Sequence, residues 1–369
     1  MDTTDASAHP TDGTLDEALQ RLHAHGPEFH GYLSNHGPMA VEALVRHGRA
    51  DSVHRWLDAY ETQLEDRPRA DSAVTDANWR EALGDPRRVT DWTAYMGRQL
   101  DDRPWREVLA EWWPRLLPGI AGAATHPVIR VGHAVRTLTE DGEEEPRVAE
   151  LAHALGYWAA RHLPLGDVPA PAGQDGPETA LWEVPPVPEQ EGGIRQRLAQ
   201  LAATPGWPAA AAALRPAAGP TDARALLAEV VAAATARYAV DAAAEPVMLV
   251  HAATAPNAVL RTLPALPEYL WVPSLHAAWA ASAAVTAAYA PCRTGRPQSP
   301  QNAAHSASAE TLDRPRPDAL ADAFERAAAH GDAHAIKLTD TALDVAAATG
   351  RPEALRAAHQ AVTLIPRER

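Results

Sequence analysis

The chain has 369 residues, of which 46% are hydrophobic and 22% are charged, and its formal net charge at pH 7 is −15. This length and composition are typical of a globular protein with a substantial core. The acidic balance argues against nucleic acid as a partner, because phosphate backbones are bound by basic surfaces.

Several features of the sequence bear on its compartment. No run of about 18 apolar residues is present to span a membrane, and the first residues lack the basic and apolar segments of a signal peptide. The single cysteine, Cys292, cannot form an internal disulfide, which fits a reducing interior. We therefore expect a cytoplasmic protein without a membrane partner.

Helical patterns dominate the chain after residues 1–13, which are polar and predicted to be disordered. Pro38 and Gly48 bracket a short helix, because proline favours the first turn and glycine the residue after the last turn. Asp51 starts an amphipathic helix that continues to Leu64. Strand-like alternation is convincing nowhere, so the sequence predicts an all-α fold. Further helices are predicted at 103–117, 127–140, 147–162, 193–203, 221–240, 268–290, 318–330, 332–349 and 353–364.

Two segments break the helical pattern. Residues 164–192 contain seven prolines and are predicted to form a long extended connection between two helical halves. Residues 291–317 are rich in proline, serine, glutamine and arginine and are predicted to form a mobile cover over the site. We expect one multi-helix domain, residues 14–369, with two poorly separable halves.

Lys337 is the only lysine of the chain, whose other basic residues are arginines and histidines. A guanidinium stays charged, whereas a buried lysine amine can become neutral and act as a base, a nucleophile or a carbamate. His334 lies one helical turn earlier on the same face. Lys337 is therefore a candidate functional residue, although a solvated position on a helix face is an equally simple interpretation.

Several histidines lie in apolar positions or at predicted helix starts. His36 and His126 each come just before a helix, and His251 lies in an apolar run that Pro256 interrupts, releasing backbone carbonyls nearby. Each alone is more often a structural histidine, but together with His334 they suggest a metal site, because imidazole binds iron, zinc, copper and nickel. Helical bundles build such sites from facing helices.

His133 is predicted to support His126 from behind, because seven residues along one helix face span about 10 Å. Motifs such as GxGxxG after a strand, GxxxxGK[ST] and GxSxG are absent, so the sequence offers no flavin, nicotinamide, nucleotide or α/β-hydrolase site. Seven tryptophans are candidates for a flat aromatic lining, although a core position is the more usual role of such residues.

Five segments resemble the questin oxidase-like family, in the right order, over about residues 15–365. They are His36–Ala40, Pro114–His133, Leu151–Trp158, His251–Thr254 and His334–Thr339. The resemblance implies oxygen insertion that opens an anthraquinone ring, with non-haem Fe(II), dioxygen as co-substrate and iron held by histidines and a carboxylated lysine. NADPH is one candidate external reductant.

Carried over residue by residue, the resemblance implies a definite set of ligands in a cavity between the two helical halves. The imidazole ligands would be those of His36, His126, His251 and His334, and the carbamylated lysine would be Lys337. Fungal relatives tend to have a histidine at the position of Arg130 and an aromatic residue at that of His133. We therefore expect a different substrate pocket.

The leading hypothesis is an iron-dependent oxygenase of secondary metabolism that cleaves a ring of a polycyclic aromatic polyketide such as an anthraquinone. His133, His153 and Tyr157 are the candidate catalytic residues, the last two as groups that handle protons. One alternative is a zinc-dependent hydrolase or lyase with the same histidines and lysine. Another is a non-enzymatic helical scaffold. The sequence does not specify an oligomeric state.

Overall fold

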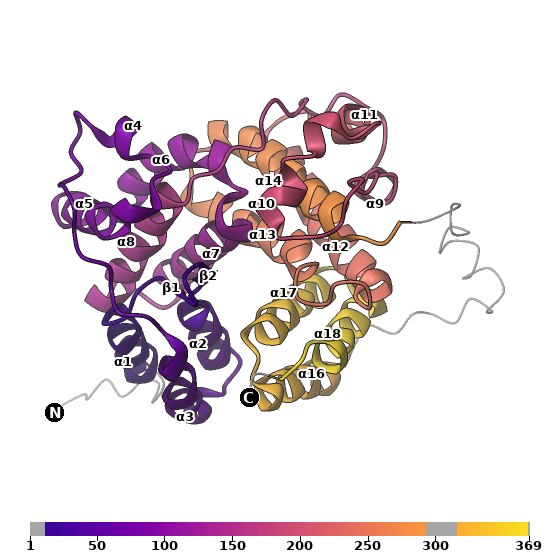
Figure 1. Cartoon of the computed structure of the whole chain (residues 1–369). Helices are drawn as coiled ribbons and strands as arrows, with labels where there is room; N and C mark the ends of the chain where they lie inside the picture. Colours follow the sequence, from indigo (N-terminus) through magenta and orange to yellow (C-terminus); the bar gives the residue numbers. More distant parts are fainter. Residues whose placement is uncertain (1–11, 293–315, 368–369) are drawn as a thin grey trace, which may run out of the picture. The chain divides into compact units, whose positions relative to one another are not determined.

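The computed structural model describes residues 12–292 and 316–367, and most of these form helices (Figure 1). In these residues the only strands are β1 (Glu28–Phe29) and β2 (Leu33–Ser34), which form a small antiparallel hairpin. The predicted all-α class is confirmed. Two compact units are present: unit 1 comprises the chain up to Pro164 together with 261–267, and unit 2 comprises 165–260 and the chain from Glu268 onward.

Unit 1 is a helical unit in which α8 packs against α5, α7 and α1, and α2 packs against α1, α3 and α7. Gly156 allows α8 to lie close to α5, because a Cβ atom there would lie 2.7 Å from the backbone nitrogen of Thr93. The helices of unit 1 are α1 (Asp12–His23), α2 (Gly37–Arg46), α3 (Ala50–Tyr60), α4 (Trp79–Ala82), α5 (Val89–Asp102), α6 (Trp105–Leu116), α7 (His126–Glu140) and α8 (Glu145–Ala160).

Tryptophans form part of the core of unit 1. The rings of Trp92 and Trp112 are both fully buried and meet edge to face, with centroids 5.5 Å apart. The indole nitrogen of Trp92 donates a 3.0 Å hydrogen bond to the carbonyl oxygen of Ala82. These two rings therefore belong to the packed core, the more usual role of tryptophans on helices.

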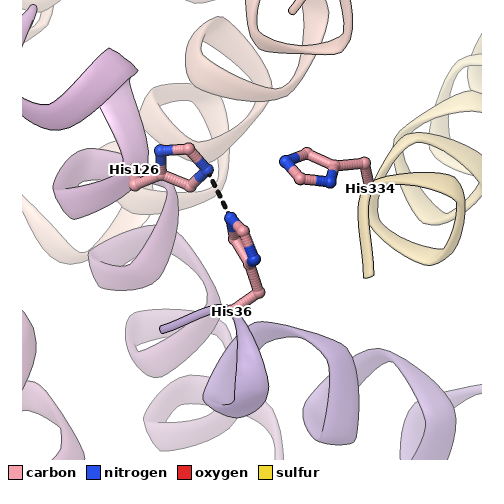
Figure 2. A group of neighbouring side chains, drawn as sticks. All are labelled: His36, His126 and His334. Carbon is pink, nitrogen blue, oxygen red and sulfur yellow. Dashed lines mark hydrogen bonds between the residues drawn. The ribbon is translucent and has the colours of Figure 1, made fainter. Parts of the chain in front are cut away.

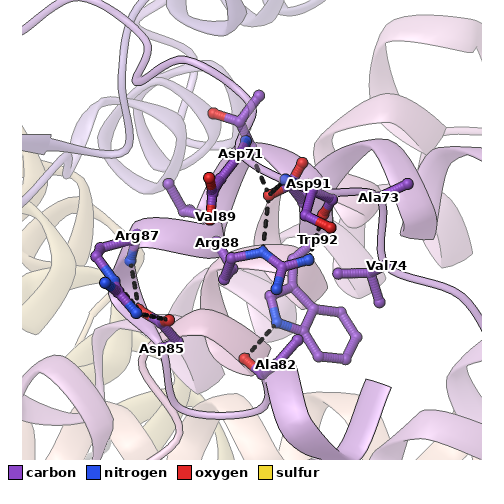
Figure 3. A network of polar contacts seen from close by, with 12 residues as sticks. Asp71, Ala73, Val74, Ala82, Asp85, Arg87, Arg88, Val89, Asp91 and Trp92 are labelled. Carbon is purple, nitrogen blue, oxygen red and sulfur yellow. Dashed lines mark hydrogen bonds and ion pairs between the residues drawn. The ribbon is translucent and has the colours of Figure 1, made fainter. Parts of the chain in front are cut away.

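A buried carboxylate fixes the segment between α3 and α5 (Figure 3). Asp91 accepts hydrogen bonds from the backbone amides of Asp71, at 3.2 Å, and Ser72, at 3.1 Å. The guanidinium of Arg88 lies 2.9 Å from the same carboxylate oxygen. Because these amides belong to a stretch with little regular structure, Asp91 gives them the partners that a helix would otherwise supply.

Unit 2 surrounds the long helix α12, which packs against α9, α14, α17 and α18. Helix α14 is alanine-rich and buried over most of its length, and its small side chains let neighbouring helices approach closely. The helices of unit 2 are α9 (Pro177–Trp182), α10 (Ile194–Leu198), α11 (Trp207–Ala212), α12 (Pro220–Asp241), α13 (Val250–Thr262), α14 (Trp271–Tyr289), α16 (Pro317–His330), α17 (Ala333–Thr349) and α18 (Pro352–Leu364). The last two residues of α13 fall in unit 1.

The structure corrects several sequence predictions. Helix α1 begins at Asp12, inside the segment predicted to be disordered. The proline-rich connection 164–192 is not extended throughout, because α9 starts at Pro177, where proline suits the first helical turn. The predicted cover at 291–317 lies mostly outside the described residues. No described helix is both long enough and apolar enough to cross a membrane.

Candidate metal centre

Unit 1 brings His36 and His126 into direct contact (Figure 2). Their Nε2 atoms lie 2.8 Å apart, and both residues are buried. His36 is the residue before α2 and His126 is the first residue of α7, so each imidazole sits at a helix N-terminus as predicted. The backbone amide of His36 donates a 2.6 Å hydrogen bond to the hydroxyl of Tyr60, which fixes the entry into α2.

The tautomer of His126 follows from its surroundings. Its Nδ1 lies 2.6 Å from the carbonyl oxygen of Ala123. Since a carbonyl only accepts hydrogen bonds, Nδ1 carries the proton, and the neutral ring presents a lone pair on Nε2. In this structure that lone pair accepts a hydrogen bond from Nε2 of His36. A metal ion could bind it instead.

The backbone before His126 is in an unfavourable conformation. In the described chain only four residues other than glycine have positive φ, and three of them are consecutive: Ala123 (43°), Ala124 (55°) and Thr125 (68°). Left-handed backbone costs a residue with a side chain about 1–2 kcal/mol. The residue before this run, Gly122, packs tightly against the backbone of Arg161. A Cβ atom on Gly122 would lie only 2.0 Å from the carbonyl oxygen of Arg161.

His251 lies in the first turn of α13 in unit 2 and is completely buried. Its Nδ1 lies 3.0 Å from the carbonyl oxygen of Met248, so Nδ1 again carries the proton. Pro256 stays inside the helix and has no amide hydrogen for the carbonyl of Ala252. That carbonyl, released as predicted, accepts a 2.7 Å hydrogen bond from the hydroxyl of Ser282 instead. Burial lowers the pKa of His251 well below 6.5.

His334 and Lys337 lie in the first two turns of α17, and both are buried. The rings of His251 and His334 meet edge to face, with centroids 5.5 Å apart. Burial lowers the pKa of His334, and the charge of Lys337 lowers it further. The same charge also lowers the pKa of His251. Lys337 therefore acts electrostatically on both imidazoles of unit 2.

Asp332 orients His334 and also caps α17. One of its carboxylate oxygens accepts hydrogen bonds from the backbone amides of His334, at 2.7 Å, and Ala335, at 3.3 Å. The same oxygen lies 3.4 Å from Nδ1 of His334. A carboxylate or carbonyl behind Nδ1 is the usual way in which proteins orient a metal-binding histidine.

His133, a candidate catalytic residue, belongs to a buried ionic cluster that connects α2 with α7. Its Nδ1 lies 2.6 Å from the carboxylate of Glu42, and the guanidinium of Arg136 lies 2.7 Å from the other oxygen of that carboxylate. Burial alone would raise the pKa of Glu42, but the charges of Arg136 and His133 outweigh it and lower the pKa to about 2. Glu42 and Arg136 were not predicted, because 94 positions separate them.

His153, the second candidate, adjoins another buried carboxylate. Its ring stacks on that of His23, with centroids 4.2 Å apart. His23, which lies 2.8 Å from Glu150, shares that carboxylate with Arg130. Burial lowers the pKa of His153 well below 6.5, so the ring is neutral at pH 7. Arg130, noted as a departure from the family, is thus part of this ion pair.

Tyr157, the third candidate, is buried in α8. Its hydroxyl donates a 3.0 Å hydrogen bond to the carboxylate of Glu28 and lies 2.8 Å from the hydroxyl of Ser34. Arg161 pairs with the same carboxylate. Burial raises the pKa of Tyr157 well above 10. The phenol therefore keeps its proton at neutral pH and can donate a hydrogen bond, but it is a poor base.

The predicted ligands thus form two groups, each within one unit. His36 and His126 make contact in unit 1, and His251 and His334 lie together in unit 2 with Lys337 near them. Two nitrogen ligands at about 2.1 Å from one ion and at right angles are about 3.0 Å apart. The 2.8 Å between the Nε2 atoms of His36 and His126 is close to that value. Imidazoles of this kind fit a divalent transition metal. That both groups share one ion stays a prediction.

Buried, oriented imidazoles of this kind could hold a metal ion. Residues 33–160 match the sequence model of the family described as questin oxidase-like. The resemblance predicted from the sequence is confirmed over this segment, which includes His36, His126 and the three candidate catalytic residues. No curated protein matches the chain.

Proposed function

We propose that the protein is an oxygenase of the questin oxidase-like type, which uses iron to cleave a ring of a polycyclic aromatic polyketide. The observation that carries this proposal is the shared orientation of three imidazoles. In His126, His251 and His334, Nδ1 faces an oxygen atom at 2.6, 3.0 and 3.4 Å. In each neutral ring Nε2 is therefore the nitrogen that a metal ion could bind.

The proposed ligands are His36, His126, His251, His334 and Lys337, with the lysine as its carbamate. Carbamylation requires the neutral form of an amine, which burial favours in general, and it would replace the positive charge that acts on His251 and His334 with a negative one. Arginine could not replace Lys337, because a guanidinium does not lose its proton. When bound, iron would supply dioxygen activation next to the substrate, with NADPH or another external reductant as the electron source.

The protein's own groups prepare this chemistry. Ala123, Met248 and Asp332 hold the imidazoles in the tautomer that a metal requires. His153 is neutral at pH 7 and can accept a proton. The protonated hydroxyl of Tyr157, which donates to Glu28 in this structure, would donate to a substrate oxygen only after exchanging that partner. Burial of the site excludes water, which protects an oxidising reaction from side products.

The test is to purify the protein without added metal, measure its metal content, and then supply Fe(II), NADPH and a dihydroxyanthraquinone under air. We expect iron binding, oxygen uptake that depends on the anthraquinone, and a product whose mass has increased by oxygen. Stoichiometric zinc without oxygen uptake would contradict the proposal and favour the hydrolase or lyase.

A further inference from the structure

We propose that Thr125 is a substrate-binding residue whose hydroxyl donates a hydrogen bond to a carbonyl or phenol oxygen of the aromatic substrate beside His126. The inference rests on the proposed function and extends it to one contact. Its basis is a buried hydroxyl in unit 1. Thr125 is only 1% exposed, and within the described residues its Oγ1 has no hydrogen-bond partner.

A structural role does not explain this hydroxyl. Threonine just before a helix usually caps it, with a β-region backbone that lets the hydroxyl accept from an amide of the first turn. Thr125 has a left-handed backbone, with φ 68° and ψ 0°, and makes no capping hydrogen bond to α7. A buried polar group without a partner destabilises the folded protein. Valine, which has nearly the same shape, would avoid that cost.

The position of the hydroxyl indicates where its partner binds. Thr125 immediately precedes His126, whose Nδ1 lies 2.6 Å from the carbonyl oxygen of Ala123 in the same turn. The left-handed run Ala123–Thr125 thus orients the imidazole and leaves the adjacent hydroxyl unpaired. Strained backbone that the surrounding structure enforces is concentrated at ligand sites, and a hydroxyl is suited to quinone and phenol oxygens because it both donates and accepts.

The experiment compares Thr125→Val and Thr125→Ser with the wild-type full chain. One measurement is the thermal unfolding midpoint without ligand. The other is the Kd of a dihydroxyanthraquinone, from absorbance titration of the metal-loaded protein under nitrogen, so that no turnover occurs. Thr137→Val is the matched control, because Thr137 is buried in α7, the helix that Thr125 precedes, but donates a 3.2 Å hydrogen bond to the carbonyl of His133.

We expect Thr125→Val to keep or raise the unfolding midpoint and to weaken dihydroxyanthraquinone binding about tenfold, the effect of one lost hydrogen bond to a ligand. Thr125→Ser should bind like the wild type, and Thr137→Val should leave the Kd unchanged. Binding of anthracene, which has three rings and no oxygen, should not respond to Thr125→Val.

Two results would overturn the assignment. Unchanged dihydroxyanthraquinone binding by Thr125→Val would remove Thr125 from the substrate site. A lower unfolding midpoint for Thr125→Val would mean that the hydroxyl has a structural partner, such as a buried water. Failure of the wild type itself to bind the anthraquinone would instead contradict the proposed function, so the two failures are distinguishable.

Discussion

The hydroxyl of Ser282 in α14 donates a 2.7 Å hydrogen bond to the carbonyl oxygen of Ala252 in α13. The interaction matters because Pro256, four residues after Ala252, has no amide hydrogen to offer that carbonyl. A side chain from a neighbouring helix thus supplies the missing donor. Helix α13, which carries His251 in its first turn, therefore continues through Pro256. Inside a helix, proline is tolerated where such a partner exists.

Ser282→Ala should therefore lower the free energy of unfolding by about 1–3 kcal/mol, because it leaves a buried carbonyl without a donor. Adding Pro256→Ala should recover most of this loss, since the new amide replaces the hydroxyl. Urea denaturation of both variants measures the effect. Equal stability of Ser282→Ala and the double variant would show that the carbonyl does not depend on this bond.

Lys337→Arg should abolish metal binding and activity and leave the helical content intact. Arginine keeps the positive charge but can be neither carbamylated nor neutral. Metal analysis and circular dichroism of the same sample provide the measurement. Lys337→Ala supplied with a short-chain carboxylate is the complementary variant, because the free carboxylate can stand in for the carbamate. Full metal content and turnover in Lys337→Arg would exclude the carbamate.

Single alanine replacements at the four predicted histidine ligands should each reduce iron content from one ion per chain to well below one. This result is expected only if the pairs of the two units bind the same ion. His276→Ala, outside the predicted set, is the control and should keep its iron. If His36→Ala and His126→Ala retain iron that His251→Ala and His334→Ala lose, the groups bind metal separately.

Glu42→Gln should destabilise unit 1 by about 3 kcal/mol at pH 7, because it leaves the buried guanidinium of Arg136 without its counter-ion. Glu140→Gln is the matched control: its partner Arg46 also joins α2 to α7, but the pair is partly exposed. Its effect should stay within about 1 kcal/mol. Equal effects of the two replacements, measured by chemical denaturation, would contradict a special role of the buried pair.

The buried carboxylates of Glu42 and Glu150 predict how the stability of the protein changes in acid. The pKa values of Glu42 and Glu150 are lowered from 4.5 to about 2 in the folded protein. A carboxylate with a lowered folded pKa contributes stability that is present above its unfolded pKa and lost as pH falls through the folded one. Unfolding free energy should therefore decline between pH 4.5 and 2. In Glu42→Gln, the free energy of unfolding should fall less steeply over this pH range than in the wild type. An equally steep fall in both proteins would show that Glu42 does not cause it.

Helix boundaries were predicted well where the sequence carries their signals. Pro38 and Gly48 correctly bracket α2, and Asp332 is the cap of α17. Helix α13 was not predicted, because Pro256 suggests an interruption and the compensating hydroxyl of Ser282 comes from a distant part of the chain. Helix α5 was also missed, although its buried residues Trp92, Tyr95 and Met96 have helical spacing.

In the candidate site, too, some residues could be predicted from the sequence and others could not. The histidines and Lys337 could be identified from composition, local context and family resemblance. Their orienting partners could not, because Ala123 and Met248 act through backbone carbonyls that every residue possesses. The left-handed run before His126 has no glycine at its three positions, so nothing in its sequence indicates positive φ. Arg136 and Glu42 meet only because α2 and α7 pack together.

Asp332 uses one carboxylate oxygen both to cap α17 and to face the imidazole of His334. The first turn of the helix and the orientation of that imidazole are therefore one cooperative unit. If Nε2 of His334 binds a cation, its Nδ1 hydrogen becomes a stronger donor, and the carboxylate is held more firmly in place. Amide hydrogens at the start of α17 would then exchange with solvent more slowly. Hydrogen–deuterium exchange at the backbone amides of His334 and Ala335 would therefore report whether a metal ion is bound to His334.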